Sequence, residues 1–525
     1  MNGFRVLDCT LRDGGYCNNW QFGNRNIKKI TSRLCEAGID IIECGFLTKK
    51  VSYDAERSLY TDVSQIAQII PAERKERQFV CMVNYGEYRA EQLPPYDGSS
   101  VDGIRVAFHK KNMVDALKLC EEIKAKGYKV FVQAMASLTY TDVEYLDLIS
   151  RINALEPYAF YIVDSFGLMK RKDLIRLFYM VEHNLRTDII IGFHSHNNMQ
   201  LAYSNAQTLV DIRSRHSVII DSSVFGMGRG AGNLNTELFV EYLNDNINSD
   251  YNLKPILSII DEILTVFYKK NYWGYSLPNY LSAKHDCHPN YAGYLDEKNT
   301  LTVESMDEIF SMMDDSKRAN YDKTYIEDLY TEYMETGRVK EAHVAEFRER
   351  IKDAVVLIIA PGKSSIDEKD KVIACASLPG VVSIAVNFDY KEFNTDYIFL
   401  SNLRRFRELP ENTRKKCIVT SNVPSKDVYI QTDYSELLNQ HEGVRDNAGM
   451  MLIRFLILSG SKKIALAGFD GYSPETSDNY AYDDMNLYAR KTAKEALNDG
   501  INACLREYSG SIEIEFVTTP RHISI

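Results

Sequence analysis

Eight short apolar runs recur over the first 230 residues, with amphipathic helical patterns between them. The runs span 5–11, 39–46, 79–84, 103–108, 129–136, 159–166, 189–196 and 218–225, and their starts are mostly 24–40 residues apart. Gly38 follows the helical pattern Asn26–Ala37, and Gly127 follows Lys111–Lys126; glycine at this point suits the turn that ends a helix. Eight strand–helix repeats with apolar strands predict an α/β fold, a (β/α)₈ TIM barrel.

The sequence pattern changes twice in the rest of the chain. The segment 249–350 is helical in pattern and rich in Tyr and Met, which predicts a helical extension of a barrel that spans 1–248. A buried strand entering a glycine turn follows at Ala354–Ser365, and we expect further strands at 381–386, 396–400, 416–420, 463–467 and 512–517. This pattern predicts a separate Rossmann-like α/β domain over 351–525. Glycine turns of this kind often hold a phosphate, so a nucleotide or phosphosugar ligand is one expectation and a structural or assembly role is the other.

Length and composition limit the classes of protein that need to be considered. The 525 residues exceed the roughly 250–300 at which one hydrophobic core stops growing, so several domains are expected. With 45% hydrophobic and 26% charged residues, and no apolar run near the ~18–20 residues that span a bilayer, we expect no membrane segment. The start Met1–Arg5 does not resemble a secretory signal, which favours a cytoplasmic location.

Cysteine spacing indicates the role of the cysteines, and the net charge indicates the class of partner. The ten cysteines are scattered and form no CxxC pair, so most are expected to be buried small hydrophobes. The net charge of −11 argues against a nucleic-acid surface, because phosphate binding needs clustered Lys and Arg. A small-molecule substrate fits better. A homo-oligomer is also expected, although no residue pattern decides it.

Five of the predicted strands end in polar residues, at the end where barrel enzymes place their chemistry. A single Asp at a strand end would most simply be a structural cap, but five such ends together favour a site. They are the segments Thr10–Tyr16, Glu43–Phe46, Asn84, Asp164–Gly167 and the pair His194 and His196.

The two histidines are the sharpest signal among these. Residues two apart on a strand point to the same face, so one ion could bind both imidazoles; the alternative is that they hydrogen-bond loop backbone. A loop with four alternating glycines follows the last strand at Gly226–Glu237. It would let backbone amides approach an anion or a metal-bound ligand, but it is not a P-loop because the Lys-Ser/Thr ending is missing.

Taken together, these motifs over about 1–240 resemble the metal-dependent pyruvate aldolases of the 4-hydroxy-2-oxovalerate aldolase type, in the superfamily of hydroxymethylglutaryl-CoA lyase and isopropylmalate synthase. The resemblance implies a metal site and a substrate site. Asp13, His194 and His196 would be metal ligands, with Asn233 as a further contact. Arg12 would hold the developing enolate, and Ser165 with Asp164 would seat the substrate. The motifs that carry the resemblance are Thr10-Leu-Arg-Asp-Gly, Ile42-Glu-Cys-Gly-Phe, Asp164-Ser-Phe-Gly, His194-Ser-His-Asn-Asn and Gly226–Asn233.

The implied chemistry is consistent with these residue types. Breaking a carbon–carbon bond beside a 2-oxo acid generates an enolate, which a divalent cation on the carbonyl oxygen stabilises as a Lewis acid. Arg12 adds a positive charge that no ordinary pH removes. The ligand set favours Mn²⁺ or Mg²⁺ and also admits Co²⁺ or Zn²⁺.

One position departs from the pattern of these aldolases. They carry a histidine two residues after the Asp-Gly of the first motif as the base, whereas this chain has Tyr16. A tyrosine is a poor base at neutral pH but a good donor or proton relay, so Glu43 or a metal-bound water is the alternative base. His109 is another candidate, with a surface role as the simpler reading. Tyr291, in a Tyr-Ala-Gly segment similar to one of these aldolases, would close the site.

We therefore expect a cytoplasmic, divalent-metal-dependent aldolase, a carbon–carbon lyase that forms or cleaves a 4-hydroxy-2-oxo acid through a pyruvate-type enolate and an aldehyde. The alternatives are an acyl-CoA/2-oxo acid condensing enzyme and a non-catalytic binding protein. The C-terminal domain has no GxGxxG or nucleophilic-cysteine setting of an aldehyde dehydrogenase. It faintly resembles the nucleotide-binding domains of sialyltransferase-like enzymes, which suggests a nucleotide or nucleotide sugar ligand and a role in surface-glycan sugar synthesis.

Overall fold

The structure is a computed structural model that describes residues 3–298, 301–334, 343–423, 427–441, 443–482, 485 and 493–524. The chain divides into two units: 1–292 with 318–320, and 293–317 with 321–525. The three-part division expected from the sequence stays a prediction.

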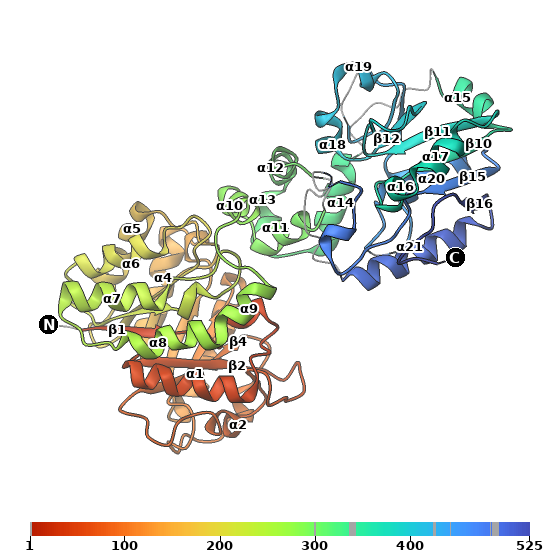
Figure 1. Cartoon of the computed structure of the whole chain (residues 1–525). Helices are drawn as coiled ribbons and strands as arrows, with labels where there is room; N and C mark the ends of the chain where they lie inside the picture. The colour runs from red at the N-terminus through yellow and green to blue at the C-terminus, as the bar shows by residue number, and fades with distance from the viewer. Residues whose placement is uncertain are drawn as a thin grey trace. The chain divides into compact units, whose positions relative to one another are not determined.

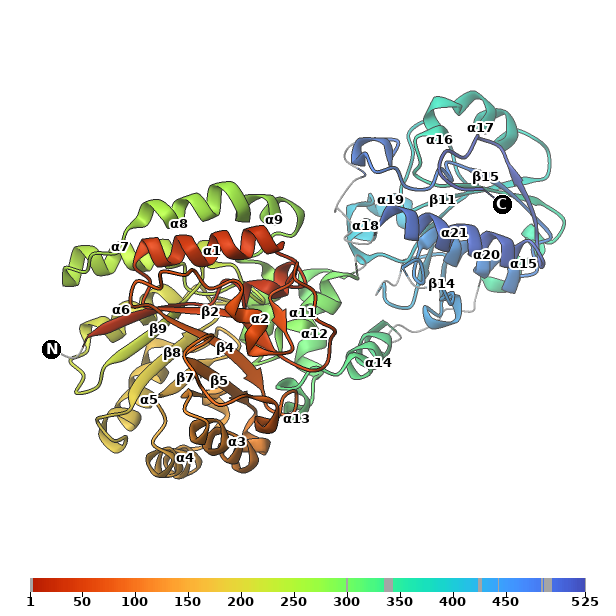
Figure 2. The same cartoon turned by 90° about the horizontal axis from the view of Figure 1, so that it is seen from below.

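Eight parallel strands of the first unit close into a barrel. Neighbouring strands follow the order β1-β9-β8-β7-β6-β5-β4-β2, and β2 pairs again with β1 to complete the ring. The helices lie around the outside of the strands (Figures 1 and 2). The expected (β/α)₈ barrel is therefore confirmed. The strands are β1 (Phe4–Asp8), β2 (Ile41–Leu47), β4 (Gln78–Asn84), β5 (Gly103–Phe108), β6 (Lys129–Ala134), β7 (Ala159–Asp164), β8 (Ile190–Ser195) and β9 (Val218–Ser222), and a short β3 (Leu59–Tyr60) pairs with β2.

The helices of this unit connect the strands and then continue past the barrel. Those between strands are α1 (Asn24–Ala37), α2 (Val63–Ala67), α3 (Met113–Ala125), α4 (Asp142–Leu155), α5 (Arg171–Asn184) and α6 (Ala202–Asp211). After the last strand come α7 (Thr236–Ile247), α8 (Leu253–Ile259), the π-helical turn η6 (Ile260–Leu264), α9 (Thr265–Lys270), α10 (Leu277–Lys284) and α11 (Pro289–Asp296). Gly38 ends α1 with a φ of +87°, the left-handed conformation that glycine adopts at little cost.

Side chains alternate between two sides of the barrel wall. Ile41 and Ile219 belong to an apolar cluster inside the barrel, while Ile42 belongs to the larger cluster shared with the helices. Two residues further along the same strands, Glu43 and Asp221 occupy the next inward positions, and both are buried. A charged layer thus lies directly above an apolar one, on the side of the strands' carboxyl ends.

Several strands end earlier than the apolar runs suggested. β1 ends at Asp8 rather than at 11, because the backbone N–H groups of Arg12 and Asp13 both donate to the carbonyl of Cys9 and bend the chain. The short 3-10 helix η1 (Gly14–Cys17) follows. The polar motif therefore belongs to a loop that folds back over the barrel.

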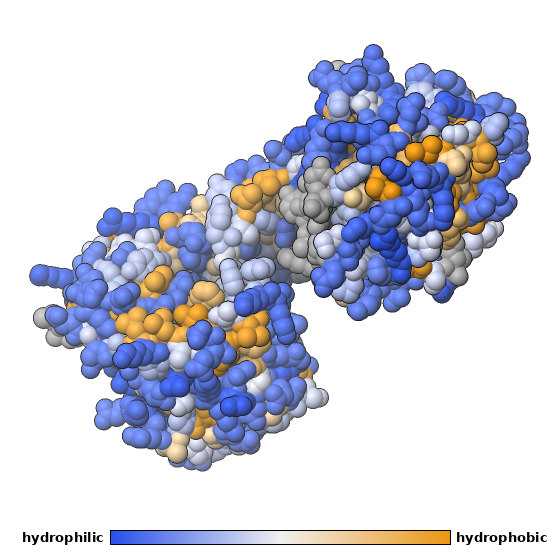
Figure 3. All heavy atoms as spheres, in the orientation of Figure 1, coloured by the Kyte–Doolittle hydropathy of each residue, from blue (hydrophilic) through white to orange (hydrophobic). Residues whose placement is uncertain are grey.

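Apolar surface gathers over α8 and α9 in Figure 3. The exposed apolar side chains there include Leu257 and Val266, which are 50% and 54% exposed. The expected homo-oligomer stays a prediction. Within the described residues, no helix is long and apolar enough to cross a membrane.

The second unit is built on a seven-stranded parallel sheet, which confirms the expected separate α/β domain. The strand order is β14-β13-β12-β11-β10-β15-β16. The strands are β10 (Val355–Ile359), β11 (Val381–Val386), β12 (Tyr397–Leu400), β13 (Cys417–Thr420), β14 (Ile430–Thr432), β15 (Lys463–Ala467) and β16 (Glu513–Phe516). The helices are α12 (Val303–Met312), α13 (Asp315–Arg318), α14 (Lys323–Met334), α15 (Val344–Ile351), α16 (Ser364–Asp367), α17 (Lys369–Ala376), α18 (Leu403–Glu408), α19 (Glu411–Arg414), α20 (Ala448–Leu458) and α21 (Lys494–Tyr508).

Candidate metal centre

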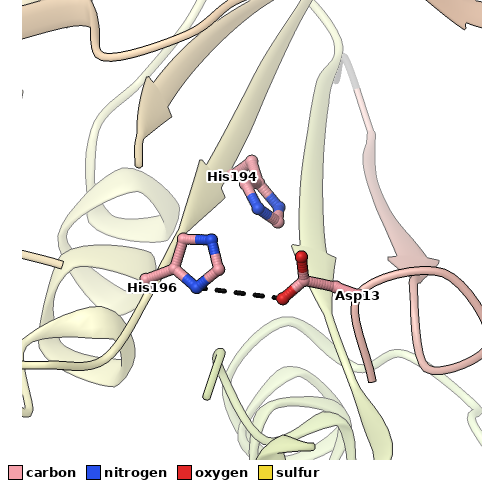
Figure 4. Close-up of side chains that lie close together, drawn as sticks. All are labelled: Asp13, His194 and His196. Carbon is pink, nitrogen blue, oxygen red and sulfur yellow. Dashed lines mark ion pairs between the residues drawn. The ribbon is translucent and has the colours of Figure 1, made fainter. Parts of the chain in front are cut away.

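Asp13, His194 and His196 come together at the carboxyl ends of the barrel strands (Figure 4). One ligand atom from each residue lies within 4.8 Å of the others, and all three side chains are buried. His194 lies one residue before the end of β8, and His196 follows the strand directly, on the same side as His194, while Asp13 comes from the loop after β1. The strand geometry inferred from the sequence therefore places both imidazoles beside one carboxylate.

His194 is oriented by a carboxylate on the neighbouring strand. Its Nδ1 lies 3.0 Å from Oδ2 of Asp221, on β9. In the tautomer that donates from Nδ1, the other ring nitrogen, Nε2, keeps its lone pair for a metal. Asp221 also accepts a hydrogen bond from Arg105, which is fully buried inside the barrel.

The charged layer forms a continuous chain of ion pairs across the barrel. Arg105 Nη1 lies 2.7 Å from Glu43 Oε2, and Arg12 Nε lies 2.9 Å from the same oxygen. Arg12 Nη1 lies 2.5 Å from Asp13 Oδ1. Three carboxylates and two guanidinium groups leave this buried layer with a net charge of about −1, which favours an added cation.

Protonation in the cluster suits metal binding. Burial alone would raise the pKa of Asp13, but the positive charge of Arg12 outweighs this effect and holds the pKa well below its usual range. Burial lowers the pKa of His196 to about 3, against the opposing effect of Asp13. Asp13 is therefore an anion and His196 a neutral imidazole at pH 7, the forms that bind metals.

Asn233 supports this assignment. Its Nδ2 donates to Asp13 Oδ2 at 2.7 Å, while its Oδ1 is buried and has no hydrogen-bond partner among the described residues. Gly228 makes the approach possible, because a Cβ there would lie 2.3 Å from Asn233 Nδ2 and 2.6 Å from Asp13 Oδ2. An unpaired amide oxygen beside a carboxylate and two imidazoles fits a divalent cation.

The glycine loop brings a further cation, Arg229, to the mouth of the site. Its backbone N–H donates to Asp13 Oδ2 at 3.3 Å, and its Nη2 donates to the carbonyl oxygen of Ser165 at 3.0 Å. The guanidinium lies 5.7 Å from the centre of the Tyr16 ring. The carbonyl oxygen of Arg229 lies 3.2 Å from Nδ1 of His196. One residue thus ties the loop after β9 to both flanks of the site.

Tyr16 stands at the rim of the site. It is 42% exposed and makes edge contacts with Trp20 and Phe46 at 4.8 and 6.4 Å between ring centroids. Desolvation raises the pKa of Tyr16 above its ordinary value. The phenol therefore keeps its proton at neutral pH and can act as a donor.

The other predicted site residues lie in different settings. The Asp164 carboxylate accepts backbone N–H groups of Leu168 and Met169 at 3.1 and 3.0 Å, so it holds the turn after β7. Ser165 Oγ accepts from the backbone N–H of Ala136 at 2.8 Å. Tyr291 is fully buried in α11, and its hydroxyl donates to the carbonyl oxygen of Asn320 at 2.7 Å. Its proposed closing role stays a prediction, as does any role of the exposed His109, just past β5.

Residues 102–263 match the HMGL-like family model, a range that includes both histidines, Asp221 and Asn233. This part of the chain is therefore similar to the HMGL-like family. The oxaloacetate decarboxylase of Mycobacterium tuberculosis is 27% identical over 244 residues, which are 45% of this chain and 69% of that protein. The 4-hydroxy-2-oxovalerate aldolase of Shewanella pealeana is 25% identical over 284 residues, which are 50% of this chain and 78% of that protein.

The chain is also similar to solved structures. The N-terminal domain of a candidate aldolase from Bacteroides vulgatus is 29% identical, with a TM-score of 0.47, and covers 56% of this chain and 96% of its own. The HMGL-like match and the relatives named as aldolases confirm the resemblance inferred from the motifs, and with it an enzyme of the lyase and aldolase type.

Three buried or partly buried charges of the HMGL-like domain were not singled out from the sequence: Arg105, Asp221 and Arg229. A signal for the first two exists, because each is the only charge in an otherwise apolar strand, as in Val218-Ile-Ile-Asp-Ser. For Arg229 the signal is a cation inside a run of glycines. Such positions need partners to be tolerated in a core, which makes them candidates for a site.

Proposed function

We propose that the HMGL-like domain is a divalent-metal-dependent aldolase, a carbon–carbon lyase that forms or cleaves a 4-hydroxy-2-oxo acid through a pyruvate-type enolate. The observation that carries the proposal is the buried set of Asp13, His194 and His196, with Arg12 within 2.5 Å of Asp13. Enolate chemistry beside a carboxylic acid needs concentrated positive charge in a site shielded from water, and this cluster supplies the place for it.

Asp13, His194 and His196 would hold the metal, with Asn233 Oδ1 as a further oxygen ligand. Once bound, the metal would act as a Lewis acid toward the substrate's carbonyl oxygen. Mn²⁺ and Mg²⁺ are the preferred ions because the remaining ligands would be oxygens of substrate and water. Elemental analysis of the purified protein decides among Mn²⁺, Mg²⁺, Co²⁺ and Zn²⁺.

We propose that Arg12 stabilises the enolate oxygen. Two of its nitrogens bond Glu43 and Asp13, while Nη2 is buried without a hydrogen-bond partner in the described part of the chain. A buried guanidinium N–H without an acceptor costs free energy unless a ligand supplies one. An enolate or carboxylate oxygen of a 2-oxo acid would supply it, and a divalent cation would turn the net charge of the layer from about −1 to +1.

Proton transfer at the substrate hydroxyl is assigned to Glu43 and Tyr16. Glu43 Oε2 is held by two arginines, but its Oε1 is buried and unpartnered among the described residues. We propose that Oε1 accepts the proton, directly or through the Tyr16 hydroxyl as a relay. Glu43→Gln would then abolish cleavage, while Tyr16→Phe would slow it without abolishing it.

The decisive experiment measures exchange of the pyruvate methyl protons with deuterated water by proton NMR, in the presence and absence of Mn²⁺. We expect metal-dependent exchange that His194→Ala abolishes. His183→Ala, on the outer face of α5, is the matched control and should leave exchange unchanged. Stoichiometric metal without exchange would contradict a pyruvate enolate. Free thiol released from acetyl-CoA and a 2-oxo acid would instead support the condensing enzyme.

A second candidate reaction is decarboxylation of a 2-oxo dicarboxylic acid, and the relative named oxaloacetate decarboxylase favours it. Loss of CO₂ beside the 2-oxo group leaves the same pyruvate-type enolate, so the same charged layer would serve. Release of CO₂ from oxaloacetate faster than the metal alone produces it, and lost in His194→Ala, would favour this reaction. Aldehyde-dependent product formation from pyruvate would favour the aldolase.

A further inference from the structure

The C-terminal sheet contains a crevice at the point where its strand order reverses. From β10 the chain builds outward through β11 to β14, and it then returns to add β15 and β16 on the other side of β10. In open parallel sheets, ligands bind outside the carboxyl ends of the strands at such a point. A crevice of about 680 Å³, open solvent included, lies there against the ends of β10, β11 and β15 and the start of α20.

A buried carboxylate faces this crevice. Asp470 follows β15 and is only 2% exposed. Its Oδ2 accepts from the backbone N–H of Ser364 at 2.7 Å and lies 3.9 Å from Arg521 Nε, while its Oδ1 has no hydrogen-bond partner among the described residues. Gly362 allows the carboxylate to come this close, because a Cβ there would lie 2.8 Å from Oδ2. A nearly buried acceptor without a donor indicates a ligand that brings one.

The position of Asp470 also indicates the charge of the ligand that the crevice would accept. Its carboxylate already occupies the N-terminal end of α16, the place where nucleotide-binding folds hold a phosphate. At the start of α20, Asn447 Oδ1 accepts from the backbone N–H groups of Gly449 and Met450, so these amides are capped as well. No Lys or Arg is among the described residues that line the crevice. The crevice is therefore suited to a neutral donor rather than to a phosphate.

Asn387 provides a second acceptor on the opposite side of β10. It follows β11 with a φ of +68°, in the left-handed region that glycine adopts freely and that Asn tolerates better than most other residues. Its Oδ1 is buried and unpartnered within the described part of the chain. Two strands of one sheet that flank a third are about 10 Å apart, a distance that a sugar ring with its hydroxyls spans. Aromatic side chains of Phe469, Tyr472 and Tyr480 line the remaining walls.

We propose that the C-terminal domain binds a neutral, hydroxyl-rich ring in this crevice, with Asp470 and Asn387 accepting hydrogen bonds from its hydroxyl groups. The aromatic walls would pack against the ring's C–H faces. The ring belongs to a sugar or to the ribose of a nucleoside. A phosphate attached to it would extend away from Asp470. This site is independent of the metal centre of the barrel.

The test uses the full-length protein and calorimetric or saturation-transfer NMR titration with two sets of probes. The first set is glucose, mannose and N-acetylglucosamine; the second is uridine, cytidine and adenosine. Asn387→Gly removes the acceptor and suits the positive φ, so the variant should keep its fold and bind at least 10-fold more weakly. Asp470→Asn can keep the bond to Ser364 and should weaken binding similarly, and Asn394→Gly in an exposed loop is the control.

The outcomes separate the sources of the ring. Binding of free sugars that both variants weaken identifies a sugar site, and binding of nucleosides with the same pattern identifies a nucleoside site. Failure of every probe to bind, or binding that Asn387→Gly and Asp470→Asn leave intact, overturns the proposal. Displacement of a bound probe by inorganic phosphate alone would also overturn it, because an anion would then occupy the crevice.

Discussion

Replacing the buried Arg105 tests whether the charged layer holds the barrel together. Arg105 is fully buried and bonds Glu43 at 2.7 Å and Asp221 on the far side. Arg105→Met keeps a side chain of similar length and removes the charge. Glu43 would still have Arg12 at 2.9 Å, whereas Asp221 would lose its guanidinium partner and keep the contact with His194. The variant therefore leaves one buried carboxylate without a cation.

The expected loss of stability follows from this one unpaired carboxylate. Breaking one buried ion pair by removing a partner costs about 3–5 kcal/mol, because a charge remains buried without compensation. In the wild-type protein, burial raises the pKa of Asp221 but the charge of Arg105 outweighs it, so the pKa is lowered. Wild-type stability from this group is present above pH ~4 and falls as the pH drops. In Arg105→Met, burial would raise the pKa of Asp221, so ionisation of this carboxyl would destabilise the variant at high pH. The difference in unfolding free energy between wild type and variant should therefore narrow toward pH 4.

The assay is urea unfolding followed by tryptophan fluorescence, with EDTA present to keep metal out of the equilibrium. Both tryptophans of the chain, Trp20 and Trp273, lie in the barrel unit, so the signal reports that unit alone. Arg105→Lys retains a charge and should lose less stability than Arg105→Met. The reasoning would be refuted if Arg105→Met were as stable as wild type at pH 8. It would also be refuted if the difference in unfolding free energy between the two proteins widened on acidification.

Three further predictions concern the site and its supports. Asp221→Asn should weaken Mn²⁺ affinity about 10–100-fold by loosening His194, as measured by metal titration. Gly228→Ala should also weaken metal binding, because its Cβ would collide with the Asn233 amide. Burial raises the pKa of Asp164 to about 7, above its unfolded value near 4. Stability from this group is thus full below pH ~4 and lost as the pH rises through 7, and Asp164→Asn should flatten this dependence in thermal unfolding at pH 4–8.

Each of these predictions has a contrary result. Unchanged metal affinity in Asp221→Asn would mean that the hydrogen bond at 3.0 Å does not orient His194. Normal metal binding by Gly228→Ala would mean that the glycine loop moves aside without cost. A variant Asp164→Asn with the wild-type pH profile would place the origin of that profile elsewhere, and Asp8, whose pKa burial raises to about 6, would be the next group to replace.

Most of the architecture could be predicted because it rests on periodicity. β11 and β15 were expected at 381–386 and 463–467, where the structure has them, since each is a continuous apolar run bounded by turn residues. β14 was not expected, because the three residues Ile430–Thr432 are too short to carry a period. The ends of β1 and β7 were placed too late, since the polar residues beyond them look strand-like until the loop's own hydrogen bonds are known.

The residues of the site also divide into those that could be predicted from the sequence and those that could not. The two histidines could be predicted as a pair because His194 lies in β8 and His196 directly follows that strand, so the two-residue spacing of extended chain puts them on one face. The contact between Arg105 and Asp221 could not be predicted, because 116 residues separate them and their meeting depends on closure of the barrel. The unpaired oxygens of Asn233 and Glu43 likewise depend on every neighbour in the fold. Sequence patterns thus identify ligands on one element and leave partners between elements to the structure.

The open sheet of the second unit differs from the closed barrel because, in the described part of the chain, it ends at two edge strands, and edge strands can associate with other chains. One edge, β14, is only three residues long. At the other, β16 has the sequence Glu513-Ile-Glu-Phe, and Lys463 of β15 pairs with both glutamates at 2.9 Å. Two such acidic strands from separate molecules would repel each other in register. The short β14 and the acidic β16 therefore both disfavour edge-to-edge association of this sheet with other chains, including during synthesis.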